Sequence, residues 1–354
     1  MTLIHEEHSR VLTGDNPLGV DVELDLPQVA PEGVALWNET FFYSTWDPEL
    51  ETGYFIHAGS EPADPTLRFA QVIVYLPGGK LVTSRSWSHP APGPELTVGQ
   101  LTMTTVDSTR RWRLQFDGAG ELTTSAAAGG GVVDGGIAVP LSFDLEVIAA
   151  APTWEIYAAT GLPHLDWAGV HFEQNIYSRG TLVIDGEKRV LNGYGFRDHS
   201  TGPRDFARVG GDRFWGFVSP TSGRSCQGIK VWNRQGELEL STTAYHLDGS
   251  TEIINAADIE LTGLETPTGQ PHDLTFAFTR PSGERITAHG RILHTVTISI
   301  ADPNHNVNGA LLDSEDDPLI LSESQVRFDW PDGDVFYGHL ERVARRSTLD
   351  LGAR

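Results

Sequence analysis

The sequence predicts an all-β fold built as two tandem antiparallel β-barrels packed together, with few short helices. Apolar and polar residues alternate along many short segments, a pattern typical of strands with one buried face. Turn residues separate these segments at short intervals, and the 38 Gly and 21 Pro suit a chain with many hairpins. The 354 residues exceed what one core normally supports, so two units are expected.

Two segments show the alternation most clearly. Apolar side chains occupy every second position of 111–116 (RWRLQF) and of 142–147 (SFDLEV), so each predicts a half-buried strand. A long polar loop, which could include a short helix, is expected at 303–318. The first 30 residues and the last ten are expected to form arms or tails. Further strands are predicted at 68–76, 181–184, 212–218, 227–233, 237–245, 272–279, 285–300 and 325–330.

The segment 151–170 is the predicted boundary between the two halves. It contains Pro152 and Pro163 and divides the chain nearly in the middle. We therefore predict an N-terminal barrel with its arm at 1–165 and a C-terminal barrel at 166–354. The Gly-rich segment 126–136 is expected to be a loop within the first barrel, because strand patterns continue after it.

Charge and composition exclude several function classes. The chain has 48 acidic and 25 basic residues, a net charge of −23, so nucleic acids and anionic membrane surfaces would be repelled. No stretch approaches the roughly 18 apolar residues of a membrane-spanning helix. The N-terminal residues do not resemble a signal peptide, so a cytoplasmic location is expected. The single cysteine, Cys226, is expected to be a buried structural residue.

The sequence gives little support for a metal or a cofactor. Its 13 His are scattered, without the i, i+4 pairing of helical zinc sites. No Gly-rich phosphate loop follows a strand and opens a helix, so nucleotide binding is not expected. The Gly-x-Ser-x-Gly elbow of esterases is absent. We therefore predict that the protein uses neither.

The densest polar cluster lies at 193–206 (GYGFRDHSTGPRDF). Asp198 and His199 are adjacent in it, and a His beside a carboxylate can be tuned for proton transfer near neutral pH. The alternative is structural, because Arg–Asp pairs also brace loops and close barrel ends as buried networks. Further members of the cluster could orient a substrate or tune this pair: Arg197, Ser200, Arg204 and Asp205.

Two other segments combine a carboxylate with imidazole or aromatic groups. His171 and Glu173 alternate on one face of a predicted strand, where Glu173 could be a general acid or could lie at an exposed barrel rim. Glu39 and Tyr43 share a face of an aromatic-rich segment near the N-terminus. This pattern suits an apolar ligand pocket, but ordinary core packing produces it as well.

These segments resemble a bacterial group of tandem lipocalin-like proteins. The most specific part is the stretch Gly-x-Gly-x-Arg-Asp-His-Ser at 193–200. The group is distantly similar to carotenoid 1,2-hydratase (hydroxyneurosporene synthase), to AttH-type proteins, to kievitone hydratase and to lipocalin-like Diels–Alderases. The resemblance covers most of the chain and rests on 37–43 with Asp47-Pro48, 171–174, 180–186, 193–205 and 338–341.

The resemblance implies two lipocalin-like barrels with an apolar cavity at or near their interface. It also implies a cofactor-free hydratase, dehydratase or double-bond isomerase that acts on a hydrophobic terpenoid, steroid or polyketide by acid–base catalysis. A cyclase or pericyclase of the Diels–Alderase type, and a carrier without catalysis, are the alternatives. On this hypothesis the catalytic residues are Asp198, His199, Asp205 and Glu173, and the substrate-binding residues are Arg197, Arg204, Ser200, Glu39, Tyr43 and Trp215.

Overall fold

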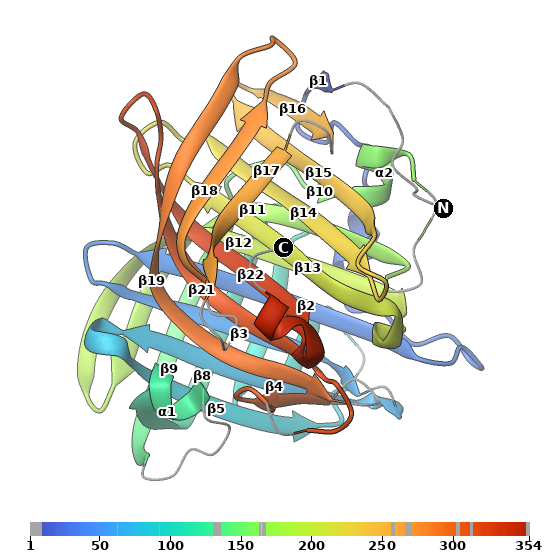
Figure 1. The fold of residues 1–354 in the computed structure, drawn as a ribbon. Coiled ribbons are helices and arrows are strands. Elements are labelled where there is room, and N and C mark those ends of the chain that lie inside the picture. Colours follow the sequence, from blue (N-terminus) through green and yellow to red (C-terminus); the bar gives the residue numbers. More distant parts are fainter. Residues whose placement is uncertain are drawn as a thin grey trace.

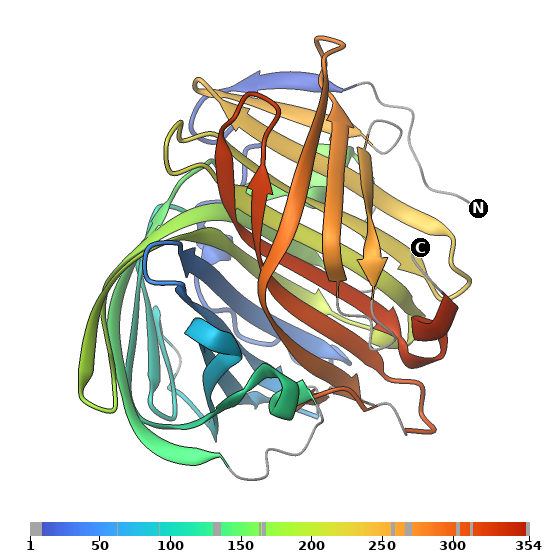
Figure 2. The same ribbon diagram turned by 60° about the vertical axis from the view of Figure 1, so that its left-hand side comes forward.

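Most of the chain forms antiparallel strands in two sheets that pack against each other (Figures 1 and 2). The α-helices among the described residues are two short ones, α1 (Ser125–Gly129) and α2 (Ile156–Thr160). The predicted all-β fold class is therefore confirmed. The computed structural model describes residues 9–61, 63–91, 93–129, 136–162, 164, 168–255, 259–265, 271–301, 305–311 and 314–351.

The first sheet contains a closed barrel of eight strands. The whole sheet has eleven strands: β2 (Trp37–Asp47), β3 (Thr52–Glu61), β4 (Asp64–Leu76), β5 (Lys80–Ser88), β6 (Glu95–Val98), β7 (Leu101–Asp107), β8 (Arg111–Thr124), β9 (Ile137–Ala149), β10 (Trp154–Glu155), β11 (Val170–Ile184) and β12 (Glu187–Pro203). The order β11-β12-β2-β3-β4-β5-β8-β9 closes because β9 pairs with both β8 and β11. Alternate side chains, such as Tyr43, Trp112 and Leu114, fill its interior.

The second sheet curls into a half-barrel. Its strands are β1 (Arg10–Thr13), β13 (Val209–Val218), β14 (Ser225–Asn233), β15 (Leu238–Leu247), β16 (Ser250–Asn255), β17 (Ile259–Glu265), β18 (Pro271–Thr279), β19 (Arg285–Ala301), β20 (His305–Asn308), β21 (Leu319–Asp329) and β22 (Val335–Arg345). In the described part of the chain no strand pairing joins β17 back to β16 or β1, so this half stays open. An aromatic core including Trp215, Phe276 and Phe328 fills its concave face.

The change from the first sheet to the second occurs between Pro203 and Val209, not near residue 165. Strands β11 and β12, which carry the Arg-Asp-His-Ser motif, are walls of the first barrel. The expected boundary and the expected placement of the motif in a C-terminal barrel therefore differ from the sheet topology. The physical reason is that the segment 154–160 does not act as a linker, because β10 pairs with β11 and α2 packs beside it.

The N-terminal arm ties the two sheets together. Strand β1 pairs with β16 of the second sheet, as the blue strand beside the yellow-orange ones in Figure 2 shows. The chain then enters the first barrel through a 3-10 helix, Val22–Asp25, whose Asp25 is buried. The predicted arm is thus an integral part of both halves.

A shared hydrophobic layer holds the sheets face to face. Phe42 and Phe55 from the first barrel belong to the same core as Phe214 and Ile229 from the second sheet. Gly216 permits this close approach, because a Cβ atom at that position would overlap the ring of Phe196. This hydrophobic layer thus lies between the core of the first barrel and the core of the second sheet, and the two sheets contact each other through it.

Three smaller predictions concern Cys226, the loop at 303–318 and the Gly-rich segment 126–136. Cys226 is free and fully buried, as predicted. The polar loop expected at 303–318, which could have included a short helix, instead contains the short strand β20, which pairs with β19. Helix α1 opens the Gly-rich segment 126–136, and residues 130–135 lie outside the described residues. No described helix is long and apolar enough to cross a membrane.

Candidate functional site

Strand β12 sends alternate residues of the polar motif to opposite faces of the barrel wall. Its pairing with β2 sets His199 opposite Phe41 and Asp198 opposite Phe42. Phe41 belongs to the barrel interior, whereas Phe42 belongs to the layer between the sheets. The structure therefore does not bring Asp198 and His199 together, although they are neighbours in sequence, because side chains alternate along a strand.

Arg197 lies inside the barrel, where it pairs with Asp25 and packs on Trp112. Its Nη2 atom lies 2.6 Å from Oδ1 of Asp25, and its guanidinium lies 4.0 Å from the ring centroid of Trp112. The other oxygen of Asp25 accepts hydrogen bonds from the Thr109 backbone at 2.7 Å and from the Trp112 indole at 3.1 Å. These contacts anchor the N-terminal 3-10 helix to the barrel interior. Arg197 thus has a bracing role, which was the structural alternative considered for the cluster at 193–206.

His199 takes part in a second interior network. Its Nε2 atom lies 3.1 Å from Oε1 of Glu39, whose Oε2 lies 2.7 Å from the Arg68 guanidinium. The imidazole stacks on Phe41 with ring centroids 4.0 Å apart. The backbone N–H of Gln28 also donates to Glu39 at 2.7 Å. His199 and Glu39 are thus brought together, but on the barrel side of the wall.

Three further predicted residues lie away from the layer between the sheets. Tyr43 is buried in the barrel interior, and burial raises the pKa of its hydroxyl above the usual range. Trp215 is fully buried in the core of the second sheet. Asp205 is partly exposed, accepts a hydrogen bond from the backbone of Ala207 at 3.1 Å and pairs with Arg208 at 3.4 Å. None of the three lines the cavity described next.

A cavity lies between the two sheets and is lined by residues from both. The centre of a water molecule can occupy about 70 Å³ of it, so it admits a few waters or part of a small ligand. Its apolar walls are Phe42, Phe206, Val209, Phe214, Val231, Ile300, Leu319, Leu321 and Val343. Its polar groups are Thr40, His57, His171, Asp198, Arg204, Asp212, Glu323 and Glu341.

The four carboxyl groups of this cavity are shifted towards their protonated forms. Burial raises the pKa of Asp198 to about 7, although the charges of Arg204 and Arg197 oppose the rise. Burial raises the pKa of Glu323 to about 8. The pKa values of Asp212 and Glu341 are raised well above their usual range, first by burial and then by neighbouring carboxylates. At neutral pH the cavity therefore holds acidic protons in apolar surroundings.

Strand pairing explains why these acids meet. Glu323 of β21 and Glu341 of β22 are directly opposite each other, a position in which two negative charges would repel. The side chain of Glu341 is within hydrogen-bonding reach of both Glu323 and Asp212. Such carboxyl–carboxyl contacts need a proton between them, so the three groups share protons.

A chain of hydrogen bonds connects Glu323 to the first barrel. Nε2 of His339 lies 2.9 Å from Oε2 of Glu323, and its Nδ1 lies 3.1 Å from the hydroxyl of Ser44. The amide of Gln325 donates to the same hydroxyl at 2.7 Å. Burial lowers the pKa of His339 to about 3, so the ring is neutral. The Ser44 hydroxyl then donates to Nδ1, and Nε2–H donates to Glu323.

Arg204 and His171 form the opposite side of the cavity. The Arg204 guanidinium donates to Thr40 at 3.1 Å and to Ser200 at 3.5 Å. The Ser200 hydroxyl lies 2.5 Å from Nδ1 of His171, whose Nε2 lies 3.4 Å from Glu173. Burial lowers the pKa of His171 well below its usual range and raises that of Glu173 well above it. These predicted residues are thus brought together around Asp198.

Sequence reasoning missed most of the carboxyl cluster. Asp212, Glu323 and Glu341 come from three strands of the second sheet, and His57 comes from β3. A signal existed for Glu323, because it lies in one strand between the apolar residues 319–321 and Val326. In the part of the chain described, no group of three or more His, Cys, Asp or Glu side chains is arranged to hold a metal ion.

Comparisons with known proteins agree with this architecture. A family model described as "Domain of unknown function (DUF7064)" matches residues 21–318. No curated protein sequence matches the chain. Similar solved structures are an AttH-type protein from Nitrosomonas europaea, with a TM-score of 0.60 over 90% of this chain and 98% of that one, and kievitone hydratase from Nectria haematococca, with a TM-score of 0.52 over 97% and 98%.

A third similar structure is CghA, also solved with Sch210972. The structure solved with this compound has a TM-score of 0.51 over 96% of this chain and 99% of that chain. All three proteins are 12% identical to this chain. At this identity the likeness establishes the lipocalin-like fold, and the activity has to be argued from the cavity.

Proposed function

The chain belongs to the family of the domain of unknown function DUF7064, and from its interface cavity we propose that it is a cofactor-free lyase or isomerase. The substrate would be a hydrophobic small molecule, such as a terpenoid, steroid or polyketide, with a carbon–carbon double bond. The enzyme would add water to this bond, remove water to form it, or shift it. One observation carries the proposal: Asp198, with a pKa raised to about 7, lines an apolar cavity beside Arg204.

In the hydration direction, protonated Asp198 would donate its proton to one alkene carbon. The new C–H bond uses the π electrons, and the positive charge develops on the other carbon. The aromatic walls Phe42 and Phe214 would stabilise this charge. Water would then form the C–O bond and release a proton to the Asp198 carboxylate, which regenerates the acid. Dehydration is the reverse, and isomerisation replaces water addition by loss of a neighbouring proton.

Other predicted residues would support this chemistry from a distance. Arg204 would keep the pKa of Asp198 near neutrality, since its charge opposes the effect of burial. Glu173 would be the alternative acid, because it pairs across from Asp198 on the same face. Arg197, His199 and the Glu39 network would hold β12 in place from inside the barrel, and so would act as positioning residues. Kievitone hydratase, a protein of similar fold, supports a hydratase as the first choice.

The test is a search for turnover in labelled water. The protein is incubated with terpenoid, steroid and polyketide alkenes, and with the corresponding alcohols, in ¹⁸O-water or in D₂O, and products are followed by mass spectrometry. On any substrate found, Asp198→Asn is expected to lower turnover about 100-fold or more, the size of a general-acid contribution. The matched control is Asp144→Asn, an exposed carboxylate paired with Arg113 on the barrel's outer face.

Two outcomes would replace the proposal. If Asp198→Asn, Glu323→Gln and Glu341→Gln all keep their turnover while Phe214→Ala loses it, the cavity folds its substrate as a cyclase or pericyclase would. If a hydrophobic ligand binds in the cavity and is recovered unchanged, with no label incorporated, the protein is a carrier.

A further inference from the structure

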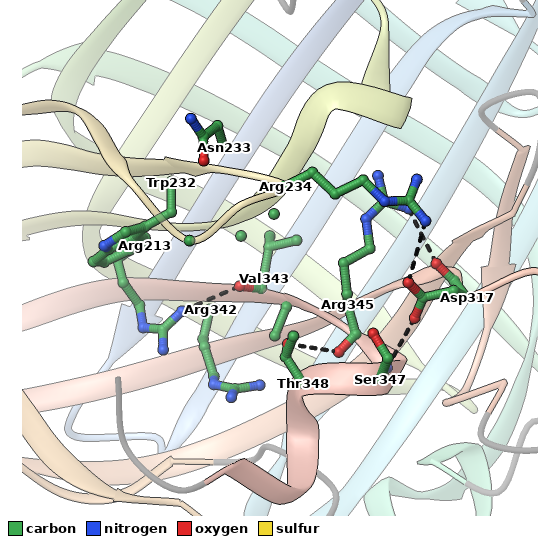
Figure 3. Close-up of a pocket in the computed structure, with 14 residues that line it drawn as sticks. Arg213, Trp232, Asn233, Arg234, Asp317, Arg342, Val343, Arg345, Ser347 and Thr348 are labelled. Atoms are coloured by element: carbon green, nitrogen blue, oxygen red, sulfur yellow. Dashed lines mark hydrogen bonds and ion pairs between the residues drawn. The ribbon is translucent and has the colours of Figure 1, made fainter. Parts of the chain in front are cut away.

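A second cavity lies at one end of the concave face of the second sheet (Figure 3). Arg213 lies on the same face of β13 as Trp215, and Arg342 lies on the same face of β22 as Leu340, both core residues of that concave face. Trp232 of β14 completes one wall. Arg345 lies on the opposite face of β22, which it shares with Val343. The site therefore adjoins the cavity between the sheets, and Val343 contributes to both linings.

Positive charge dominates this second cavity. Its lining contains four arginines, Arg213, Arg234, Arg342 and Arg345, against one carboxylate, Asp317. The chain as a whole carries a net charge of −23, with 25 basic residues in all. A local excess of three positive charges therefore stands against the charge of the whole protein, and it needs a cause other than average composition.

Two of the arginines are fixed by backbone carbonyl groups. Arg213 donates to the backbone carbonyls of Asp212 at 2.8 Å and Val343 at 3.1 Å. Arg345 donates to those of Val209 at 2.8 Å and Asp317 at 3.1 Å. Carbonyl acceptors orient a guanidinium without cancelling its charge, so these side chains are preorganised and still cationic.

The cavity combines buried cationic groups with an aromatic wall, so it suits a ligand with an anionic end and an organic end. Arg342 and Arg345 are buried, only 4% and 7% exposed, and burial lowers the pKa of Arg345 because the charged form is poorly solvated there. In Figure 3, Trp232 and Arg213 lie on one side of Val343 and Arg234 on the other. The guanidinium of Arg213 lies 5.6 Å from the Trp232 ring centroid. Nη2 of Arg234 lies 3.5 Å from Oδ2 of Asp317.

We propose that this cavity binds a small molecule carrying a phosphate monoester or diphosphate, with the anionic group bound by arginines of the lining and the organic group beside Trp232. Several guanidinium forks match the multiple oxygens and charges of phosphate better than a single carboxylate does. A nucleic-acid strand is disfavoured, because the rest of the acidic surface would repel it. The proposal does not depend on the activity of the interface cavity.

The first experiment is calorimetric titration of the full chain with inorganic pyrophosphate at low ionic strength. Saturable binding is expected, and Arg213→Gln and Arg234→Gln are each expected to weaken it about tenfold, the size of one charge-assisted contact. Arg234 is half-exposed, so its replacement leaves the fold intact. The control Arg113→Gln removes an exposed arginine of the first barrel and should bind as the wild type does.

A second titration, with phenyl phosphate, tests the organic end of the site. Trp232→Leu is expected to weaken phenyl phosphate more than inorganic pyrophosphate. The proposal is overturned if neither probe binds, if the two pocket variants bind pyrophosphate as tightly as the wild type, or if Arg113→Gln weakens it equally. It is also overturned if a short single-stranded oligonucleotide binds through the same arginines more tightly than both small probes.

Discussion

The buried position of Asp198 in the cavity between the sheets determines how its carboxyl group titrates. Burial raises its pKa to about 7, and the charges of Arg204 and Arg197 limit the rise. The unfolded chain loses this proton near pH 4. Between about pH 4 and 7 the native state therefore binds more protons than the unfolded state, and this residue makes the free energy of unfolding fall as the pH rises.

Asp198→Asn is expected to reduce that fall. At pH 8.5 the variant should be more stable than the wild type by up to about 4 kcal/mol, since three pKa units are lost. At pH 4 the two should be nearly equal. Urea unfolding at several pH values measures this difference. The control is Asp144→Asn, because Arg113 lowers the pKa of the Asp144 carboxyl. This variant should show the same change of unfolding free energy with pH as the wild type from pH 5 to 8.5. If Asp198→Asn also showed the wild-type change, the account would be contradicted.

Glu323 and Glu341 should be strongly coupled, because Glu323 raises the pKa of Glu341, whereas a hydrogen bond with Glu341 lowers the pKa of Glu323. In a double-mutant cycle at pH 8.5, Glu323→Gln and Glu341→Gln are expected to differ from additivity by about 1–3 kcal/mol. The free energies of unfolding of the four proteins give this coupling. Additive effects would mean that the two carboxyls do not share a proton.

Asp25→Ala is expected to destabilise the protein by about 3–5 kcal/mol, because it leaves the buried Arg197 charge unpaired. The double variant Asp25→Ala, Arg197→Met should lose less than the two single changes together. Chemical unfolding at pH 7 measures all three. A loss below about 1 kcal/mol for Asp25→Ala would show that the N-terminal 3-10 helix does not brace the barrel.

At the scale of the element, β12 shows what the sequence could and could not predict. The segments 111–116 and 142–147 alternate regularly, and both are strands. In β12, glycines and charged residues hide the same alternation, so its motif was interpreted as one polar cluster. Once the segment is known to be a strand, the period of two alone separates Asp198 from His199. The proposed catalytic pair of Asp198 and His199 was therefore wrong, because adjacent residues of a strand lie on opposite faces.

The strands of the second sheet show a different limit. Asp212, Glu323 and Glu341 are far apart in the chain, and only the pairing of β13, β22 and β21 brings them together. In the sequence alone, three acids in three separate strands have the pattern of solvent-facing residues. The same holds for the arginines of the second cavity, which come from β13, from β22 and from the turn after β14.

At the scale of the whole molecule, the contact between the two sheets creates the site. The cavity takes Asp198 and Arg204 from one side and the acid cluster from the other, so neither half holds it alone. The resemblance to lipocalin-like proteins predicted a cavity at or near the interface. The first barrel is closed and filled, which leaves the layer between the sheets as the place for this cavity.

Gly216→Val tests this contact directly. The added side chain would collide with Phe196 across the layer, so the variant should be destabilised by about 1–3 kcal/mol, the usual cost of overpacking. Calorimetry should show a lower unfolding temperature. The control Gly249→Ala lies in a hairpin with open space around it, but its positive φ of 74° makes a small loss expected there too. An unchanged unfolding temperature for Gly216→Val would contradict the packing of the two sheets.

The central claim is that the interface cavity keeps a carboxylic acid protonated near neutral pH. Infrared difference spectroscopy of the wild type minus Asp198→Asn, recorded across a pH titration, measures this directly through the C=O stretch of a protonated carboxyl. We predict that the band is present at pH 6 and disappears with a midpoint near 7. Its loss below pH 5, as for an ordinary exposed aspartate, would contradict the account.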